Sequence, residues 1–431
     1  MRLVAVLVCG LLVFCGTAES AAKGKKGGAK LVRQVKGGRL TRNGDFYVLH
    51  LKGTWYEMGM AHGLLLLSQV EVNTVGVWRE RIVPMVGEET AKQLRTMALG
   101  LRPMLAEEVR EELRGLADGS GVPLEEIELA ALMGGPMNFQ TGRGVEGGGA
   151  NPIRPNCSSL AAFGKATKDG NLIYTHNFDF EMGLGVHDRP LVAAYESEDG
   201  QRFCTLGWAG ILFAITGLNE SQISVGCIGA TSAAERPDGL PMGLIVRKVL
   251  QEAEDLDDVE AIVKGARRMC GFNYVAGDGK VPEGRVLETN AERVAVFGPN
   301  QRSKDDPEWM LHVADAVFRA DTAMDPAVRR TQTCTKGNPS TPELESPVGS
   351  GAYDSRYKVM GDLLQKWHGK TDLAVGIKIM QATAMPKSNM QSFVCDSSAM
   401  VFRVAVAKGE ATAYKREYVK FDFEELFGES K

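Results

Sequence analysis

The stretch that decides the fold of this chain reads Asn156-Cys157-Ser158-Ser159-Leu160-Ala161-Ala162-Phe163-Gly164-Lys165-Ala166-Thr167. A lone thiol stands near its start, after a loose polar segment and before a run of predicted strands. This position predicts a concealed amino terminus. If the peptide bond ahead of Cys157 broke, the thiol could use its own α-amine as general base, because such an amine titrates near about pH 8. Cys157 would then supply both the nucleophile and the base.

The segment before Cys157 changes in composition. From Gly134 to Pro155, glycines are interspersed with prolines, and such a segment resists regular structure and stays accessible. We therefore expect a linker over residues 134–156 that ends at a site of self-cleavage.

Short runs of β-branched and aromatic residues follow Cys157, separated by Gly, Asp or Asn, and they predict strands. The predicted strands cover residues 159–163, 172–178, 191–196, 203–208, 213–216, 223–227, 273–276, 285–288, 294–297, 391–394, 400–406 and 412–418. Two predicted helices interrupt them, and Asp255 caps the second. Strands, then helices, then strands again indicate an α+β fold of layered sheets.

Upstream of the linker, residues 47–51 read as a strand, and Thr54 with Glu57 forms a capping-box pattern that predicts a helix start. His62 shares an apolar face of that helix, which predicts a core or interface histidine rather than a ligand. Residues 91–132 are helical in pattern. The chain ahead of the linker should therefore end in a helical hairpin or small bundle.

Residues 1–20 have the features of a secretory signal: Arg2 is the positive start, Leu3 to Phe14 are apolar, and Ala18-Glu19-Ser20 is a small-x-small cleavage site. We therefore expect an exported protein, periplasmic or extracellular. The predicted organisation is a signal peptide at 1–20, a flexible basic segment at 21–45, an N-terminal helical part at 46–133, a linker at 134–156 and a core at 157–431.

Composition excludes several functions. A formal net charge of -4 with 24% charged residues gives no global basic field for nucleic acid. We find no phosphate loop, dinucleotide fingerprint or histidine metal pair, so we predict no metal and no organic cofactor. Of eight cysteines, two leave with the signal, and the other six are widely spaced. If Cys157 is kept for chemistry, an odd number remains, so at least one should be a buried, unpaired thiol.

Three stretches resemble a known family. They are Leu49-His50-Leu51-Lys52-Gly53-Thr54-Trp55-Tyr56-Glu57-Met58-Gly59-Met60-Ala61-His62-Gly63, then Asn156 to Leu172 leading into Asn177-Phe178-Asp179-Phe180, and Gly217-Leu218-Asn219-Glu220. The similarity extends weakly to residues 315–319 and 389–393. In order and spacing they resemble the Cys-type N-terminal nucleophile hydrolases of the C45 peptidase family, which contains penicillin acyl-coenzyme A acyltransferases.

This resemblance implies a four-layer αββα sandwich of mainly antiparallel sheets, made as a precursor. It implies self-cleavage between Asn156 and Cys157 into partner fragments of residues 21–156 and 157–431. It also implies hydrolysis of a non-peptide N-acyl amide or a thioester, a small-molecule substrate, through a thioester acyl-enzyme. Two alternatives remain open: an acyltransferase that passes the same thioester to an amine, and an unprocessed envelope-binding protein of the same fold.

The resemblance also implies roles for individual residues. Asp179 would orient the new ammonium of Cys157, since it ends the next predicted strand; the alternative is a strand-end turn aspartate. Asn219 would donate an amide N–H to the oxyanion, and the alternative is an asparagine of a left-handed turn.

Other positions concern the substrate or depart from the family. His176 stands where many relatives carry arginine, so it is either a substrate-binding residue or a satisfied strand histidine. Asn273 resembles a pocket-lining position, with a polar strand-start residue as the alternative. Residues Arg319-Ala320-Asp321-Thr322 replace an expected Thr-Asn-His-like run, so the identity of the substrate does not transfer.

Overall fold

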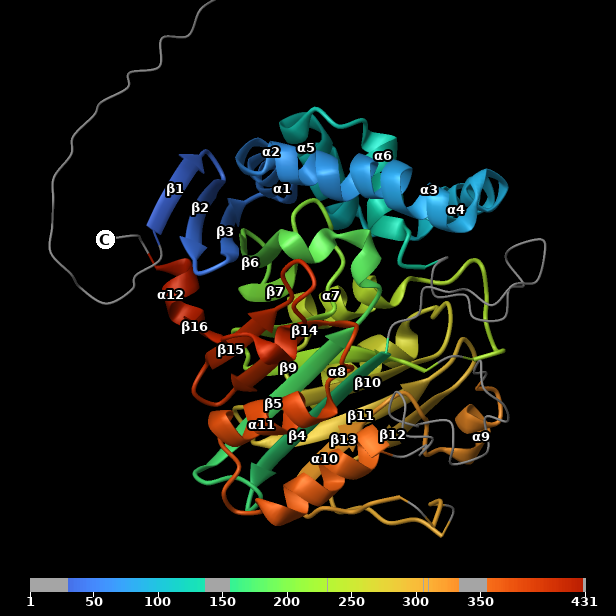
Figure 1. The fold of residues 1–431 in the computed structure, drawn as a ribbon, viewed down its shortest axis with the longest axis vertical. Helices are drawn as coiled ribbons and strands as arrows, with labels where there is room; N and C mark the ends of the chain where they lie inside the picture. Colours follow the sequence, from blue (N-terminus) through green and yellow to red (C-terminus); the bar gives the residue numbers. More distant parts are fainter. Residues whose placement is uncertain are drawn as a thin grey trace, which may run out of the picture.

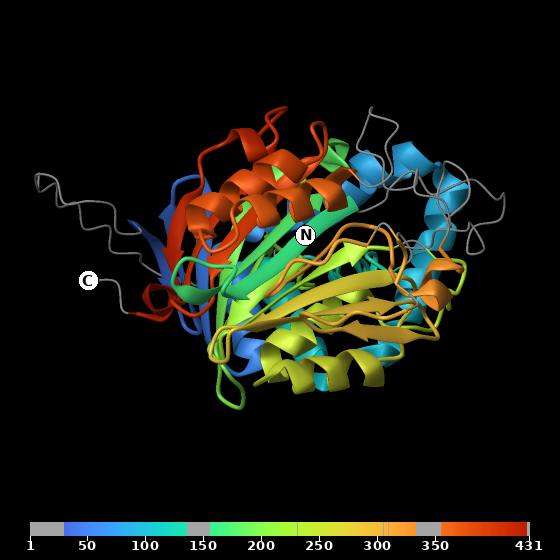
Figure 2. The same cartoon turned by 90° about the horizontal axis from the view of Figure 1, so that it is seen from below.

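Two stacked sheets form the centre of the structure. The computed structural model describes residues 30–135, 156–230, 232–304, 306–308, 310–332 and 355–428, and in it a ten-stranded sheet faces a six-stranded sheet. Helices α10 (Ser355–Lys366) and α11 (Leu373–Thr383) cover the outer face of the smaller sheet. Helices α7 (Met242–Glu252) and α8 (Leu256–Gly265) cover the outer face of the larger sheet (Figure 2). The four-layer αββα architecture predicted from the sequence is confirmed.

The larger sheet contains strands from both sides of Cys157. Its order is β1 (Lys30–Val35), β2 (Gly38–Asn43), β3 (Phe46–Gly53), β6 (Pro190–Ser197), β7 (Phe203–Trp208), β8 (Thr216–Asn219), β9 (Ile223–Gly229), β10 (Phe272–Asp278), β11 (Glu283–Thr289) and β12 (Val294–Phe297). Neighbours are antiparallel, except that β3 pairs parallel with β6. The segment ahead of Cys157 is therefore built into the sheet.

The smaller sheet carries Cys157 and is antiparallel throughout. Its order is β13 (Ala316–Arg319), β4 (Asn156–Gly164), β5 (Gly170–Asp179), β14 (Asn389–Asp396), β15 (Val401–Val406) and β16 (Val419–Asp422). Strands β4 and β5 contact β9 and β10 of the other sheet. Cys157 therefore begins a central strand that faces the interior of the sandwich.

The N-terminal helices gather beyond one end of the larger sheet (Figure 1). They are α1 (Trp55–Leu65), α2 (Leu67–Glu71), α3 (Val83–Val86), α4 (Glu88–Gly100), α5 (Glu107–Ser120) and α6 (Leu124–Leu132), with π-helical turns at Val72–Gly76 and Trp78–Ile82. The predicted capping box is confirmed: Thr54 and Glu57 cap α1 reciprocally. Glycines let α1 and α5 pack closely, since a Cβ at Gly115 would lie 2.1 Å from the Tyr56 carbonyl oxygen.

Some sequence predictions were wrong. Residues 30–43, predicted to be part of a flexible basic segment over 21–45, form β1 and β2, because β3 supplies a pairing partner that composition does not reveal. The strand predicted at 213–216 begins only at Thr216. The strand predicted at 412–418 is instead a 3-10 turn at Ala413–Lys415, ahead of β16.

Two short helices complete the fold, α9 (Pro326–Arg329) and α12 (Phe423–Phe427). The predicted signal peptide and most of the predicted linker lie outside the described residues. Within the described part of the chain, no helix is long and apolar enough to cross a membrane. The expectation of a buried, unpaired thiol is confirmed, and Cys204, Cys227, Cys270 and Cys395 are all buried and free. Cys334 is not among the described residues.

Candidate active site

Cys157 is the second residue of β4, and its side chain is 1% exposed. It lies opposite Phe178 of β5, while Asn156 lies opposite Asp179. Paired residues of an antiparallel ladder point to the same face and successive residues alternate. The thiol therefore shares the interior face of the sandwich with Phe178, and Asp179 points towards the layer of α10 and α11.

Two side chains bind the backbone of Cys157. Asp321, in the loop after β13, accepts a hydrogen bond from the Cys157 backbone N–H at 3.1 Å through Oδ1. Arg356 of α10 donates to the Cys157 carbonyl oxygen at 2.9 Å and pairs with Asp321 Oδ2 at 2.5 Å. We call Asp321 and Arg356 the Cys157 clamp. The nitrogen that this clamp holds is the atom that would become the α-amine.

Asp179 lies on the other side of Arg356. Its Oδ1 accepts from Asn389 Nδ2 at 2.8 Å and from the Met385 N–H at 3.2 Å, while Oδ2 is 3.7 Å from Arg356 Nη1. Burial raises the pKa of Asp179 to about 7, although the Arg356 guanidinium opposes this shift. The carboxylate in contact with the Cys157 nitrogen is thus Asp321, in the position that the sequence analysis gave to Asp179.

The thiol is neutral in the uncut chain. Burial raises the pKa of Cys157 well above its ordinary value, and the nearby Cys227, Asp179 and Asp321 raise it further. Burial also raises the pKa of Asp321, opposed by Arg356. A thiol in this environment needs a local proton acceptor before it can react.

Asn219 makes hydrogen bonds to three backbone groups in this structure. Its Nδ2 donates to the backbone oxygens of Leu250 at 3.2 Å and Ala253 at 2.8 Å, and its Oδ1 accepts from the Ile223 N–H at 2.9 Å. Asn219 therefore ties the end of α7 to the β8–β9 turn. An oxyanion role would need an amide N–H that these contacts already use.

His176 and Asn273 both lie between the sheets. His176 donates from Nε2 to the Cys227 carbonyl oxygen at 2.9 Å, and burial lowers its pKa to about 4, so the ring is neutral near pH 7. The buried Nδ1 of His176 has no partner among the described residues, so only one ring nitrogen is satisfied. Asn273 donates to the Ala320 carbonyl oxygen at 3.0 Å, next to Asp321, and its buried Oδ1 has no partner among the described residues. Asn273 thus supports the loop that carries Asp321.

Sequence reasoning missed Arg356 and the role of Asp321. Asp321 was visible only as a departure from the family run at 319–322. Its position depends on Glu288, which pairs with Arg319 at 2.6 Å and accepts from the Met324 and Asp325 N–H groups at 2.7 Å each. No local signal marked these residues as a site.

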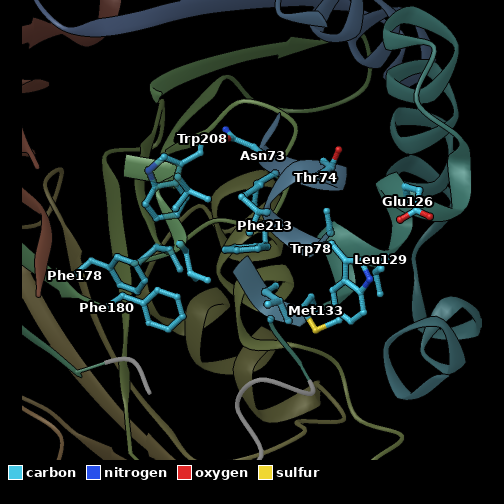
Figure 3. Close-up of a pocket in the computed structure, with 18 of the residues that line it drawn as sticks. Asn73, Thr74, Trp78, Glu126, Leu129, Met133, Phe178, Phe180, Trp208 and Phe213 are labelled. Atoms are coloured by element: carbon cyan, nitrogen blue, oxygen red, sulfur yellow. The ribbon is translucent and has the colours of Figure 1, made fainter. Parts of the chain in front are cut away.

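An apolar pocket lies beside Phe178, the residue that pairs with Cys157 across the strands (Figure 3). It encloses about 830 Å³, open solvent included. Phe178, the cross-strand neighbour of Cys157, is one of its walls, and the Phe178 ring lies 5.3 Å from the ring of Phe180 and 5.8 Å from that of Trp208. The other labelled wall residues are Phe213 of the core and Asn73, Thr74, Trp78, Glu126, Leu129 and Met133 of the N-terminal helical part.

The pocket has little charge. Among the described residues that line it, one carries a carboxylate: Glu126 pairs with both terminal nitrogens of Arg95, at 3.2 and 3.1 Å. The π-helical turns bring Asn73, Thr74 and Trp78 to the wall, and π-helical segments are often found at functional sites. The pocket therefore suits an apolar group that packs against Phe178. In the described part of the chain, no group of three His, Cys, Asp or Glu side chains is arranged to hold a metal.

Comparisons with known proteins identify relatives. Residues 166–297 match the model of the acyl-coenzyme A:6-aminopenicillanic acid acyl-transferase family. An uncharacterized protein of Archaeoglobus fulgidus is 26% identical over 388 residues, which are 83% of this chain and 62% of that protein. Protein dcd1A of Dictyostelium discoideum is 24% identical over 307 residues, 62% of this chain and 64% of that protein. This chain thus spans less than two thirds of the length of these relatives.

Three solved structures are also similar. A variant of the conjugated bile acid hydrolase from Clostridium perfringens has a TM-score of 0.41 and 12% identity, over 64% of this chain and 95% of that chain. An N-acylethanolamine-hydrolyzing acid amidase ortholog of Caenorhabditis elegans scores 0.40 at 14% identity, over 62% and 100%. Penicillin V acylase of Agrobacterium tumefaciens scores 0.36 at 9% identity, over 58% and 83%. The family match over residues 166–297 confirms the predicted resemblance to the penicillin acyl-coenzyme A acyltransferase family.

Proposed function

We propose that this protein is an exported, self-processing cysteine amidohydrolase that cleaves N-acyl amides with apolar acyl groups. One observation carries the proposal: the Cys157 clamp holds the backbone nitrogen and oxygen of a buried cysteine whose cross-strand neighbour, Phe178, lines an apolar pocket. Any buried backbone group needs a hydrogen-bond partner, but here the charged pair of Asp321 and Arg356 supplies both partners, and it would keep the nitrogen in place once Cys157 became a chain end.

Processing begins with attack of the Cys157 thiol on the carbonyl carbon of Asn156. An S–C bond forms, the Asn156–Cys157 C–N bond breaks, and the nitrogen takes up the thiol proton. Water then cleaves this thioester to give a carboxylate at Asn156 and a free thiol and α-amine at Cys157. The clamp supports this step because it fixes both backbone atoms of Cys157 while the bond ahead of them breaks.

Catalysis uses the same atoms. The α-amine takes the thiol proton, the thiolate attacks the substrate amide carbon, and the amine product leaves with that proton. Water resolves the acyl-enzyme to a carboxylic acid. Because Arg356 already pairs with Asp321, this carboxylate is only partly available to hold the ammonium form, so the neutral amine stays accessible as the base.

The pocket supports the acyl part of the proposal. Phe178 borders both the thiol and the pocket, so an acyl group bound there would present its carbonyl carbon to Cys157. Burial of each CH₂ of that group contributes roughly 0.8 kcal/mol. An apolar acyl chain therefore binds better than a charged one.

Acyl transfer is the second candidate, because the matched family is named for an acyl-transferase. An amine would then replace water in resolving the thioester. The ratio of acid to new amide, measured with and without added amines, separates the two activities.

The experiment compares wild-type protein with Cys157→Ala and Cys157→Ser. We expect wild type to give two fragments by intact mass, the second starting at Cys157, and to hydrolyse a fatty or arylacetyl amide. Cys157→Ala should stay whole and inactive. Cys204→Ala, which removes another buried free thiol, is the matched control and should process normally. Unchanged hydrolysis in Cys157→Ala would refute the proposal, and an uncut, inactive wild type would favour the envelope-binding alternative. Cell fractionation tests export.

A further inference from the structure

One wall of the pocket is a loop that depends on the N-terminal helical part. The loop joins β7 to β8 over residues 209–215, and Ile211, Phe213 and Ile215 line the pocket. We call this segment the pocket loop. The position of the loop determines the shape and depth of the pocket at this wall.

Two side chains ahead of Cys157 anchor the pocket loop. The Gly210 N–H donates to His62 Nε2 of α1 at 3.0 Å. Asn73 Nδ2, in the first π-helical turn, donates to the Ala209 carbonyl oxygen at 3.0 Å. Gly210 has a φ of 81°, and a Cβ there would lie 3.1 Å from the Val70 Cα, so the loop backbone packs directly on this helical segment.

His62 is costly at this position. It is fully buried, and burial with the nearby Arg247 charge lowers its pKa to about 3, so the ring is neutral. Because Nε2 accepts from Gly210, the ring proton is on Nδ1, which has no partner among the described residues. An unpaired buried N–H destabilises a fold, so a leucine would be cheaper for packing alone. The hydrogen bond from the Gly210 N–H is therefore the reason we infer for an imidazole at this position.

We propose that His62 is a positioning residue that sets the acyl-chain selectivity of the enzyme by holding the pocket loop. This inference rests on the proposed function and adds that the segment before Cys157 determines which acyl groups fit. His62 does not line the pocket, so it acts only through Gly210 and the residues that follow it. Loss of the anchor should loosen the wall formed by Ile211, Phe213 and Ile215.

The experiment measures kcat and KM for N-acyl amides of one amine with graded acyl chain lengths. We expect His62→Leu to change the long-to-short ratio of kcat/KM by about 10-fold or more, mainly through KM, because one methylene alone contributes about 10- to 200-fold in a fitted pocket. His62→Gln keeps an acceptor for Gly210 and should restore the ratio. His50→Leu, on β3, is the control and should leave the ratio unchanged.

Hydrogen exchange of the Gly210 amide gives a readout that needs no activity. It should be protected in wild type and His62→Gln, and faster in His62→Leu. If His62→Leu does not fold, Asn73→Ala replaces it in the exchange measurement only, because it removes the other anchor but Asn73 itself lines the pocket. A folded anchor variant with the wild-type ratio and wild-type exchange would overturn the inference. Absence of hydrolysis in wild type would overturn the proposed function instead, while the exchange result would still report on the anchor.

Discussion

A buried ion pair joins the two parts of the chain on either side of Cys157. Glu112 of α5 is 0% exposed and pairs with Arg247 of α7, which is 1% exposed. Arg247 also donates to the Leu212 carbonyl oxygen at 3.0 Å and to Gln251 Oε1 at 3.0 Å, and its guanidinium carbon lies 4.9 Å from the Tyr195 ring centroid. The pair thus fixes α5 to the core and to the pocket loop.

Removal of one partner should be expensive. Glu112→Ala leaves a buried guanidinium without its counter-ion, and breaking such pairs costs about 3–5 kcal/mol. Glu112→Gln should cost less, because an amide oxygen still accepts a hydrogen bond from Arg247. The double variant Glu112→Leu with Arg247→Met removes both charges, so it should be more stable than Glu112→Ala by about 2 kcal/mol or more.

Urea denaturation followed by tryptophan fluorescence measures these free energies of unfolding. A Cys157→Ala background keeps the chain in one piece, so the transition does not depend on fragment concentration. The reasoning fails if Glu112→Ala costs less than about 1 kcal/mol, or if the double variant is no more stable than Glu112→Ala.

Gly115→Ala should destabilise the protein by about 1–3 kcal/mol or more in thermal denaturation, because its Cβ would collide with α1. The control is Gly100→Ala, which has open space around it and should be neutral or stabilising. Equal changes in stability for the two variants would contradict the close packing of α1 and α5. Arg356→Met should slow precursor cleavage by about 100-fold or more, because Asp321 loses its partner, and Arg356→Lys should restore part of the rate. A time course of intact masses measures this rate, and normal cleavage in Arg356→Met would exclude a role for the clamp. Burial raises the pKa of Asp179 to about 7, above its unfolded value of about 4. The contribution of Asp179 to the free energy of unfolding is therefore complete below about pH 4 and is lost as the pH rises to about 7. Asp179→Asn should flatten this fall in the free energy of unfolding, and an unchanged slope in urea titrations at several pH values would contradict the shift.

The sequence predicted strands well where short runs of β-branched and aromatic residues are bounded by turn residues. The strand expected at 294–297 has those bounds, and the reversal between β4 and β5 appeared in the predicted strands that flank Gly170. The strand expected at 213–216 starts late because the pocket loop is docked on α1 and the first π-helical turn. The segment at 412–418 turns instead because the Tyr414 N–H donates to Asn389 Oδ1, a contact from another strand.

The candidate site also has a part that local sequence predicts and a part that depends on distant residues. The place of Cys157 at the start of a strand could be predicted, because a loose polar segment precedes it and strand-forming residues follow it. Its clamp could not, because Asp321 and Arg356 are 164 and 199 residues away in the chain and reach it only through the packing of β13 and α10. The oxyanion role of Asn219 stays a prediction, and its turn motif did not reveal that the backbone oxygens of Leu250 and Ala253 bind its amide group.

The parallel pairing of β3 with β6 has a practical consequence. Seven residue pairs, from Tyr47 with Leu191 to Gly53 with Ser197, complete the hydrogen bonding of β6 on that side. Residues 157–431 expressed alone would leave this row of N–H and C=O groups open, and such an edge is a template for aggregation. Soluble material should therefore come from co-expression or joint refolding of both pieces. Because β3 and β6 pair across the cleavage site, the two fragments should stay associated after cleavage.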